Sequence, residues 1–216
     1  MAQIFHPSAN HIAKISIAAA VIGAGALLAF AYSMDRGAYI TDVGVAKDQP
    51  VPFSHKHHVT DDGIDCRYCH TSVETSAVAG VPATEICMSC HSQIWSNAVL
   101  LEPVRASFRT GESLAWTRIH DLPDFVYFNH SIHINKGIGC SSCHGRVDLM
   151  PLTYKVNTLY MNWCIDCHRH PERQIRPRDQ VFNMAYEYPA NQEELGRKLM
   201  KDYHVQSLTD CYTCHR

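Results

Sequence analysis

All ten cysteines of the chain fall into one repeated pattern, C-x-x-C-H. The five copies are Cys66, Cys69, His70; Cys87, Cys90, His91; Cys140, Cys143, His144; Cys164, Cys167, His168; and Cys211, Cys214, His215. This spacing is typical of covalent haem c attachment, in which the two thiols form thioethers and the histidine binds the iron from the proximal side. The sequence therefore predicts five covalently bound haems.

Other cysteine sites use similar spacing, and they explain the pattern less well. Zinc ribbons, disulfide frameworks and thioredoxin-like redox motifs all pair cysteines. None of them requires a histidine directly after every second cysteine, as all five copies have here. Since no cysteine is left over, none remains for an iron–sulfur cluster, a structural disulfide or a catalytic thiol.

Histidines outside the motifs are candidates for the distal side of each iron. A short element occurs twice, as FSHKHH at residues 53–58 and as FNHSIH at residues 128–133, each time ahead of a haem motif. Histidines at i and i+3 lie on one side of a short helix, so each ring could serve a different haem. We therefore expect the distal ligands His55, His58, His130 and His133.

The fifth distal ligand is open between three histidines, which we rank in the order His120, His204 and His170. His57 falls on another face of its element, and we interpret it as a solvated neighbour. A methionine would raise the potential of its haem. Because histidines suffice, we interpret the nearby methionines as packing residues: Met88, Met150, Met161 and Met184.

The composition supports a haem-filled interior. Five haems in 216 residues leave too little chain for a conventional core around each one. We therefore expect a mainly α-helical and irregular fold, with short helices and almost no sheet, wrapped around the haems. The formal net charge of −2 gives no basic face for nucleic acid.

The N-terminal part predicts a membrane anchor. Residues 1–14 are polar, and residues 15–34 are close to the length that spans a bilayer. A cleaved signal peptide is the alternative, with Ala29-Phe30-Ala31 as the cleavage site, but the apolar run exceeds the usual h-region. Residues 35–52 contain glycine and proline and predict an extended linker.

Haem attachment in bacteria takes place outside the cytoplasm, which orients the chain. We expect a single-pass protein of the bacterial cytoplasmic membrane, with a cytoplasmic tip at 1–14 and a periplasmic haem domain at 53–216. Its parts are a first dihaem module (53–96), a connector (97–127), a second dihaem module (128–172) and a C-terminal segment with the fifth haem (173–216).

Three local predictions concern the segments between haem motifs. Glu102-Pro103 predicts a helix start and Thr110-Gly111 its end. Residues 191–203 predict a helix with Asn191 as N-cap and Glu194 in a capping-box position. Residues 173–189 are rich in turn signals and charges, and we expect a surface loop.

The repeated histidine elements resemble those of the small multihaem cytochromes of the c3/c7 type. The longer pattern WTRIHDLPDFVYFNHSIHINKGIGCSSCHG, followed by LYMNWCIDCHRHPE, resembles the membrane-anchored pentahaem subunits of alternative complex III, a quinol-oxidising respiratory complex. By analogy with the c3/c7 type, His55 serves the first motif and His130 the third. His58 and His133 would reach haems held by other motifs and tie the two modules together.

The resemblance also implies partners. They are an iron–sulfur and molybdopterin-enzyme-like subunit, polytopic quinol-binding membrane subunits, and a monohaem cytochrome c or an oxidase as electron acceptor. The implied role is electron transfer without a catalytic residue in this chain. Six-haem subunits of quinone-reducing complexes share the pattern, so it leaves the direction of electron flow open.

Two further hypotheses belong to other functional classes. A tetrahaem-type quinol dehydrogenase also has one N-terminal anchor, but that family has a methionine two residues after a haem-binding histidine, where this chain has Ser72. A multihaem reductase would have an open catalytic iron. The C-x-x-C-K variant of pentahaem nitrite reductases is absent from this sequence, which argues against the reductase.

Overall fold

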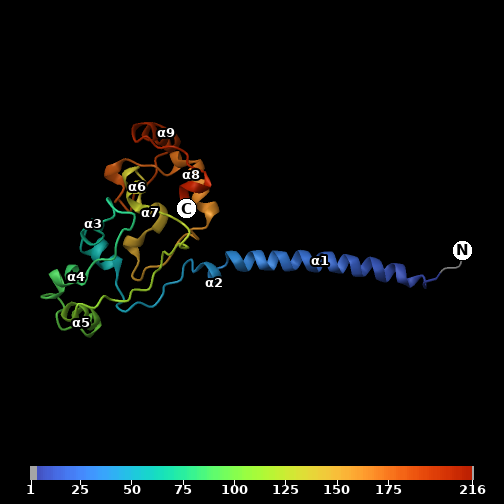
Figure 1. The fold of residues 1–216 in the computed structure, drawn as a ribbon, viewed down its shortest axis with the longest axis horizontal. Helices are drawn as coiled ribbons and strands as arrows, with labels where there is room; N and C mark the ends of the chain where they lie inside the picture. Colours follow the sequence, from blue (N-terminus) through green and yellow to red (C-terminus); the bar gives the residue numbers. More distant parts are fainter. Residues whose placement is uncertain (1–3, 216) are drawn as a thin grey trace. The chain divides into compact units, whose positions relative to one another are not determined.

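The computed structural model describes residues 4–215 and divides into two compact units, Met1–Val43 and Gly44–Arg216. Helices and irregular segments make up both (Figure 1). Within residues 4–215 the only β pairing is two isolated bridges, Ala46 with Tyr154 and Ile138 with Ile175. The expected mainly helical and irregular fold is therefore confirmed.

The first unit consists of a long helix and a short one, α1 (Ser8–Arg36) and α2 (Ala38–Thr41), separated by Gly37 in an extended conformation. The apolar run of the sequence continues as unbroken helix, and α1 has no buried residue. Its 29 residues rise about 43 Å, enough to cross a bilayer. By length and composition, it is the one candidate span among the described residues.

In the second unit, all five C-x-x-C-H motifs lie in helical turns. The helices are η1 (Lys56–Asp61), α3 (Cys66–Cys69), α4 (Thr84–His91), η2 (Val99–Leu101), α5 (Glu102–Thr110), α6 (His130–Asn135), α7 (Cys140–His144), η3 (Val147–Leu149), α8 (Met161–Arg169), η4 (Pro171–Arg173), η5 (Arg178–Gln180), α9 (Gln192–Asp202) and α10 (Cys211–Cys214). A helical turn places the two thiols of each motif on the same side.

Two helices test the local predictions. α5 begins at Glu102 with proline in its first turn and ends at Gly111, whose φ of 73° suits glycine. α9 also forms as predicted, with Asn191 as N-cap, but the Asn191 side chain makes no capping hydrogen bond. The backbone carbonyl of Asn191 instead accepts from the amide of Glu194. The capping-box prediction is therefore wrong, although the helix is right.

Apolar clusters of the second unit are small. One contains Val51, Leu101 and Val104, with Trp116 packed against it, where α5 lies beside α4 (Figure 1). The other contains Val73, Ile134 and Val181, with Cys140 packed against it. Both clusters lie next to haem motifs, so the aliphatic core supports the motifs.

The segment 173–189 is not the expected surface loop. Ile175 and Arg176 are 0 % and 1 % exposed, and Val181 and Met184 are also buried. The Arg176 guanidinium donates to the hydroxyls of Ser141, Ser142 and Tyr188 and to the carbonyl of Asn183. These bonds satisfy both terminal nitrogens of the buried guanidinium, whereas no partner for its Nε is found within the described residues.

Gly139 leaves the room that Arg176 occupies. A Cβ at Gly139, one residue before the third motif, would collide with the guanidinium carbon of Arg176. The guanidinium also lies over the rings of Tyr186 and Tyr188. Segment 173–189 therefore packs under the third haem motif instead of covering it loosely.

Candidate haem-binding site

Three pairs of imidazole rings face each other, and each pair joins a motif histidine to a histidine of a repeated element. The ring centroids of His58 and His91 are 6.2 Å apart, and those of His133 and His168 are 6.1 Å apart. His130 and His144 are 6.4 Å apart with nearly parallel rings, at an interplanar angle of 10°. The first pair lies at the second motif, and the other two lie at the fourth and the third.

These separations fit two axial ligands of one metal ion. Two imidazoles on opposite sides of a metal, with nitrogen–metal bonds of about 2 Å, have ring centroids roughly 6.3 Å apart. All three measured distances lie near this value. The donor set of two neutral imidazoles and two thiols per motif is also that of a bis-histidine haem c site. The residues therefore fit the group that the sequence predicts.

Hydrogen bonds at Nδ1 leave the other ring nitrogen free to coordinate. Nδ1 bonds an oxygen atom at eight of the predicted ligands: His55, His58, His70, His91, His130, His133, His168 and His215. In seven of these the oxygen is a backbone carbonyl, so Nδ1 carries the hydrogen. Such partners fix the tautomer and the ring orientation of a metal ligand and present Nε2.

The two repeated elements also have the same aromatic support. Phe53 stacks on His58 with centroids 4.4 Å apart, and its edge meets His55 at 4.9 Å. Phe128 stacks on His133 at 4.5 Å and meets His130 at 4.7 Å. One phenylalanine thus holds both histidines of each element. This phenylalanine is the first residue of each repeat, so the repeated sequence itself contains the signal.

His55 lies beside the histidine of the first motif. Burial, and then the neighbouring charges of His70 and His58, lower the pKa of His55 to about 4. Its Nδ1 is 2.9 Å from Oγ1 of Thr153, a residue of the second module. The structure therefore places His55 at the first motif, and Thr153 is a contact that no sequence pattern indicated.

The second histidine of each element stays within its own module. His58 faces His91 and His133 faces His168, so these rings reach another motif as expected. Both pairs are internal to one module, however, and the expected tie between modules through these histidines does not form. An i, i+3 pair spans only two neighbouring haem positions, which is too short to cross to the other module.

The histidine of the third motif lies at the centre of the domain. Burial lowers the pKa of His144 to about 3, assisted by His120, His130, His70 and His55 in that order. The His120 ring meets that of His144 edge to face, with centroids 4.2 Å apart. Nε2 of His120 is buried, and no hydrogen-bond partner for it is found within the described residues.

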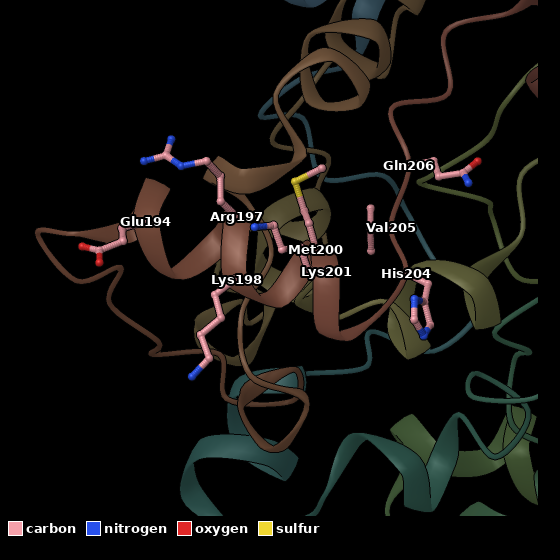
Figure 2. Close-up of a pocket in the computed structure, with 8 residues that line it drawn as sticks. All are labelled: Glu194, Arg197, Lys198, Met200, Lys201, His204, Val205 and Gln206. Atoms are coloured by element: carbon pink, nitrogen blue, oxygen red, sulfur yellow. The ribbon is translucent and has the colours of Figure 1, made fainter.

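The structure does not bring together the predicted fifth pair. His215 donates from Nδ1 to the carbonyl of Phe125, and the aromatic ring 5.8 Å from its own is that of Phe125. His120 is held at the third motif instead. His204 lies at the end of an open groove along α9 (Figure 2). His170 lies 3.5 Å from a carboxylate oxygen of Glu172.

His57 and three of the four methionines are placed as interpreted from the sequence. His57 lies near the carboxylates of Asp61 and Asp62 and is half exposed. Met150 and Met184 are buried, and Met88 packs against an aliphatic cluster. Met161 is 67% exposed, so its interpretation as a packing residue is wrong.

None of the ten cysteines is in a disulfide. Burial raises the pKa of seven of them, most of all at the third motif, where Cys140 rises to about 11 and Cys143 to about 12. A raised pKa keeps a thiol protonated and suppresses adventitious oxidation. Cys90 and Cys211 are exposed and the other eight are not.

Comparisons with known proteins agree with this donor set. Residues 126–216 match the family described as cytochrome c7 and related cytochrome c. This region is cytochrome c7-like. A relative from Nitratidesulfovibrio vulgaris, the multihaem cytochrome c subunit of menaquinone reductase, is 37% identical over 103 residues. That match spans 45% of this chain and 46% of the relative, so it covers about half of each.

The matched region is therefore similar to multihaem cytochromes c. The family match contains the third, fourth and fifth motifs and the second repeated element. The first two motifs lie before residue 126. Their assignment as haem sites depends on the repeated histidine element and on the distance between the rings of His58 and His91. Haem c bound through cysteine thioethers is the cofactor of this class of protein.

Proposed function

We propose that the chain is a pentahaem c-type electron-transfer subunit of a membrane-bound quinone-linked complex. Its distal ligands for the first to fourth motifs are His55, His58, His130 and His133. The observation that carries the proposal is the set of three imidazole pairs at 6.1–6.4 Å, each with one motif histidine and one repeat histidine.

Bound haem c supplies an iron that alternates between the ferric and ferrous states and carries one electron at a time. Each pair of imidazoles would hold the iron from two sides and would leave no position on it for a substrate. Carbonyl oxygens at Nδ1 hold the rings in one orientation, and rigid ligands reduce the reorganisation that accompanies each electron transfer. Phe53 and Phe128 shield the ring faces from water. These residues favour electron transfer over catalysis.

The proposed setting is the bacterial cytoplasmic membrane, with α1 as a single-pass anchor and the haem domain on the periplasmic side. Support comes from the apolar helix and from the relative, which is a subunit of a menaquinone reductase. The proposed partners are an iron–sulfur and molybdopterin-enzyme-like subunit and polytopic quinol-binding subunits. A monohaem cytochrome c or an oxidase accepts the electrons in the quinol-oxidising arrangement.

The relative's name favours a second direction of electron flow. A menaquinone reductase delivers electrons to the quinone, whereas an alternative complex III-like complex removes them from the quinol. The axial histidine pairs serve either direction equally, since they hold the iron without contacting quinone. The direction of electron flow is therefore set by the complete complex and is measured on that complex.

The test is purification of the tagged full-length chain from its native membrane in mild detergent, followed by anaerobic addition of quinol or quinone. We expect iron–sulfur and polytopic subunits to copurify. Reduction of the haem absorbance bands by quinol supports the quinol-oxidising arrangement, and reoxidation of prereduced haems by quinone supports the quinone-reducing one. A chain recovered alone that exchanges electrons with neither would contradict the proposal.

A further inference from the structure

The first and second haem motifs lie side by side. The hydroxyl of Tyr68, inside the first motif, is 2.9 Å from Oγ of Ser89, inside the second. His91, which follows the thiols of the second motif, has its ring 6.2 Å from that of His58.

The first motif, and not the second, lies against the third. Val73, which donates its amide to the carbonyl of His70, shares an apolar cluster with Cys140 of the third motif. The amides of His130 and Ser131, ahead of the third motif, donate to the carbonyls of Ala77 and Ser76, which follow the first motif. Contacts to the third motif thus come from the first, although the second is nearer in sequence.

The fourth and fifth motifs continue in sequence order. From one turn of α6, the ring of His130 lies 6.4 Å from that of His144 in the third motif, and the ring of His133 lies 6.1 Å from that of His168 in the fourth. The hydroxyl of Ser207, shortly before the fifth motif, donates to the carbonyl of His168. His168 donates from Nδ1 to the carbonyl of Leu208, which lies shortly before the fifth motif. The fourth motif therefore lies between the third and the fifth.

From these contacts we infer that the haem motifs form one row in the order second, first, third, fourth, fifth. The inference rests on the proposed electron-transfer function. Exposure supports it independently, because the two exposed cysteines, Cys90 and Cys211, belong to the second and fifth motifs. These are the two ends of the row, whereas the motifs between them have no exposed thiol.

The order determines where electrons enter and leave. An electron from a reduced donor protein converts one end site from ferric to ferrous, and an oxidised acceptor protein takes one electron from the other end. Each internal step reduces one site and oxidises its neighbour, so the electron count is conserved along the row. The partner surfaces are then the second motif, around Cys90, and the fifth motif, around Cys211.

The experiment marks one site and removes others. In the full-length chain, His130→Met gives the third motif a methionine ligand, with a higher potential and its own electron paramagnetic resonance signal. A nearby ferric site carries positive charge that favours reduction of the marked site, and this effect weakens with distance. The midpoint potential of the marked site is titrated after removal of the first motif (Cys66→Ala with Cys69→Ala) or the second (Cys87→Ala with Cys90→Ala).

We expect the midpoint potential of the marked third site to fall when the first motif is removed. It should stay unchanged when the second motif is removed. The reverse result would overturn the row and restore the order of the sequence. Removal of the fourth motif (Cys164→Ala with Cys167→Ala) is the positive control, because it neighbours the third in either order. If the variant without the first motif does not assemble, the variant without the second decides alone. An unchanged midpoint supports the row and a shifted one contradicts it.

Failure of the proposed function has a separate signature. The haem content of the unmodified chain, measured by the pyridine haemochrome method, must be five per chain before any variant is compared. A lower content would contradict the pentahaem proposal itself. Five haems per chain, together with shifts in midpoint potential that do not follow the proposed neighbours, would contradict only the order of the motifs in the row.

Discussion

Nδ1 of His55 and Oγ1 of Thr153 lie 2.9 Å apart and join the two modules. The reciprocal contact is present as well, since Nδ1 of His130 donates to the carbonyl of Ala77 at 3.0 Å. Each module thus orients a distal histidine of the other. The partner of His55 is a side-chain hydroxyl, whereas the partner of His130 is a backbone carbonyl. Only the contact of His55 can therefore be removed by replacing the partner residue.

Thr153→Val keeps the shape of the side chain and removes the acceptor. We expect the potential of the first site to rise, because a ligand whose Nδ1–H has no acceptor is less basic and stabilises the ferric state less. The unpaired Nδ1–H should also cost about 1–3 kcal/mol of stability. The measurement is a redox titration followed by electron paramagnetic resonance. Thr153→Ser is the matched control and should restore the wild-type signal. An unchanged potential in Thr153→Val would exclude this role.

His133→Ala should affect one site only. The structure pairs His133 with His168 at 6.1 Å, so the loss of this ring should leave the fourth site five-coordinate or methionine-ligated. Electron paramagnetic resonance should show one high-spin or shifted signal with the remaining signals unchanged. His57→Ala is the control and should leave the spectrum unaltered. A fully low-spin, unshifted spectrum in His133→Ala would remove His133 from the ligand set.

Gly196→Ala tests the packing beneath the C-terminal segment. Alanine normally stabilises a helix interior by about 1 kcal/mol relative to glycine. Here a Cβ would meet the carbonyl oxygen of Glu172, where α9 packs against η4, so the substitution should destabilise the domain by about 1–3 kcal/mol. Thermal unfolding of the haem-loaded protein measures this change. Lys198→Ala on the same helix should stay within about 0.5 kcal/mol. A stabilised Gly196→Ala variant would contradict the packing.

Removal of residues 1–36 tests the anchor. The second unit is compact by itself and α1 has no buried residue, so a chain that starts at Gly37 behind an exchanged signal peptide should be soluble and carry its haems. Centrifugation of the cell lysate followed by haem-stained gels measures the distribution. Retention of the truncated chain in membranes that lack its partners would contradict a single anchor.

The sequence predicted the features that depend on short spacing. The C-x-x-C-H turns, the FxHxxH elements and α5 all depend on residues a few positions apart, and the structure has each of them. The buried Arg176 and the Thr153 contact depend on partners 34 and 98 positions away, and no local pattern indicates them. His120 illustrates the same limit, because a count of the remaining histidines left it for the fifth haem, whereas the fold places it at the third motif.

The most direct test of the central proposal is the intact mass of the mature chain after denaturation. Covalent haem survives denaturation, so each occupied motif adds one haem to the polypeptide mass. We expect five haem additions and no thiol that reacts with an alkylating reagent. Four or fewer additions, with two reactive thiols for each missing haem, would contradict a pentahaem cytochrome.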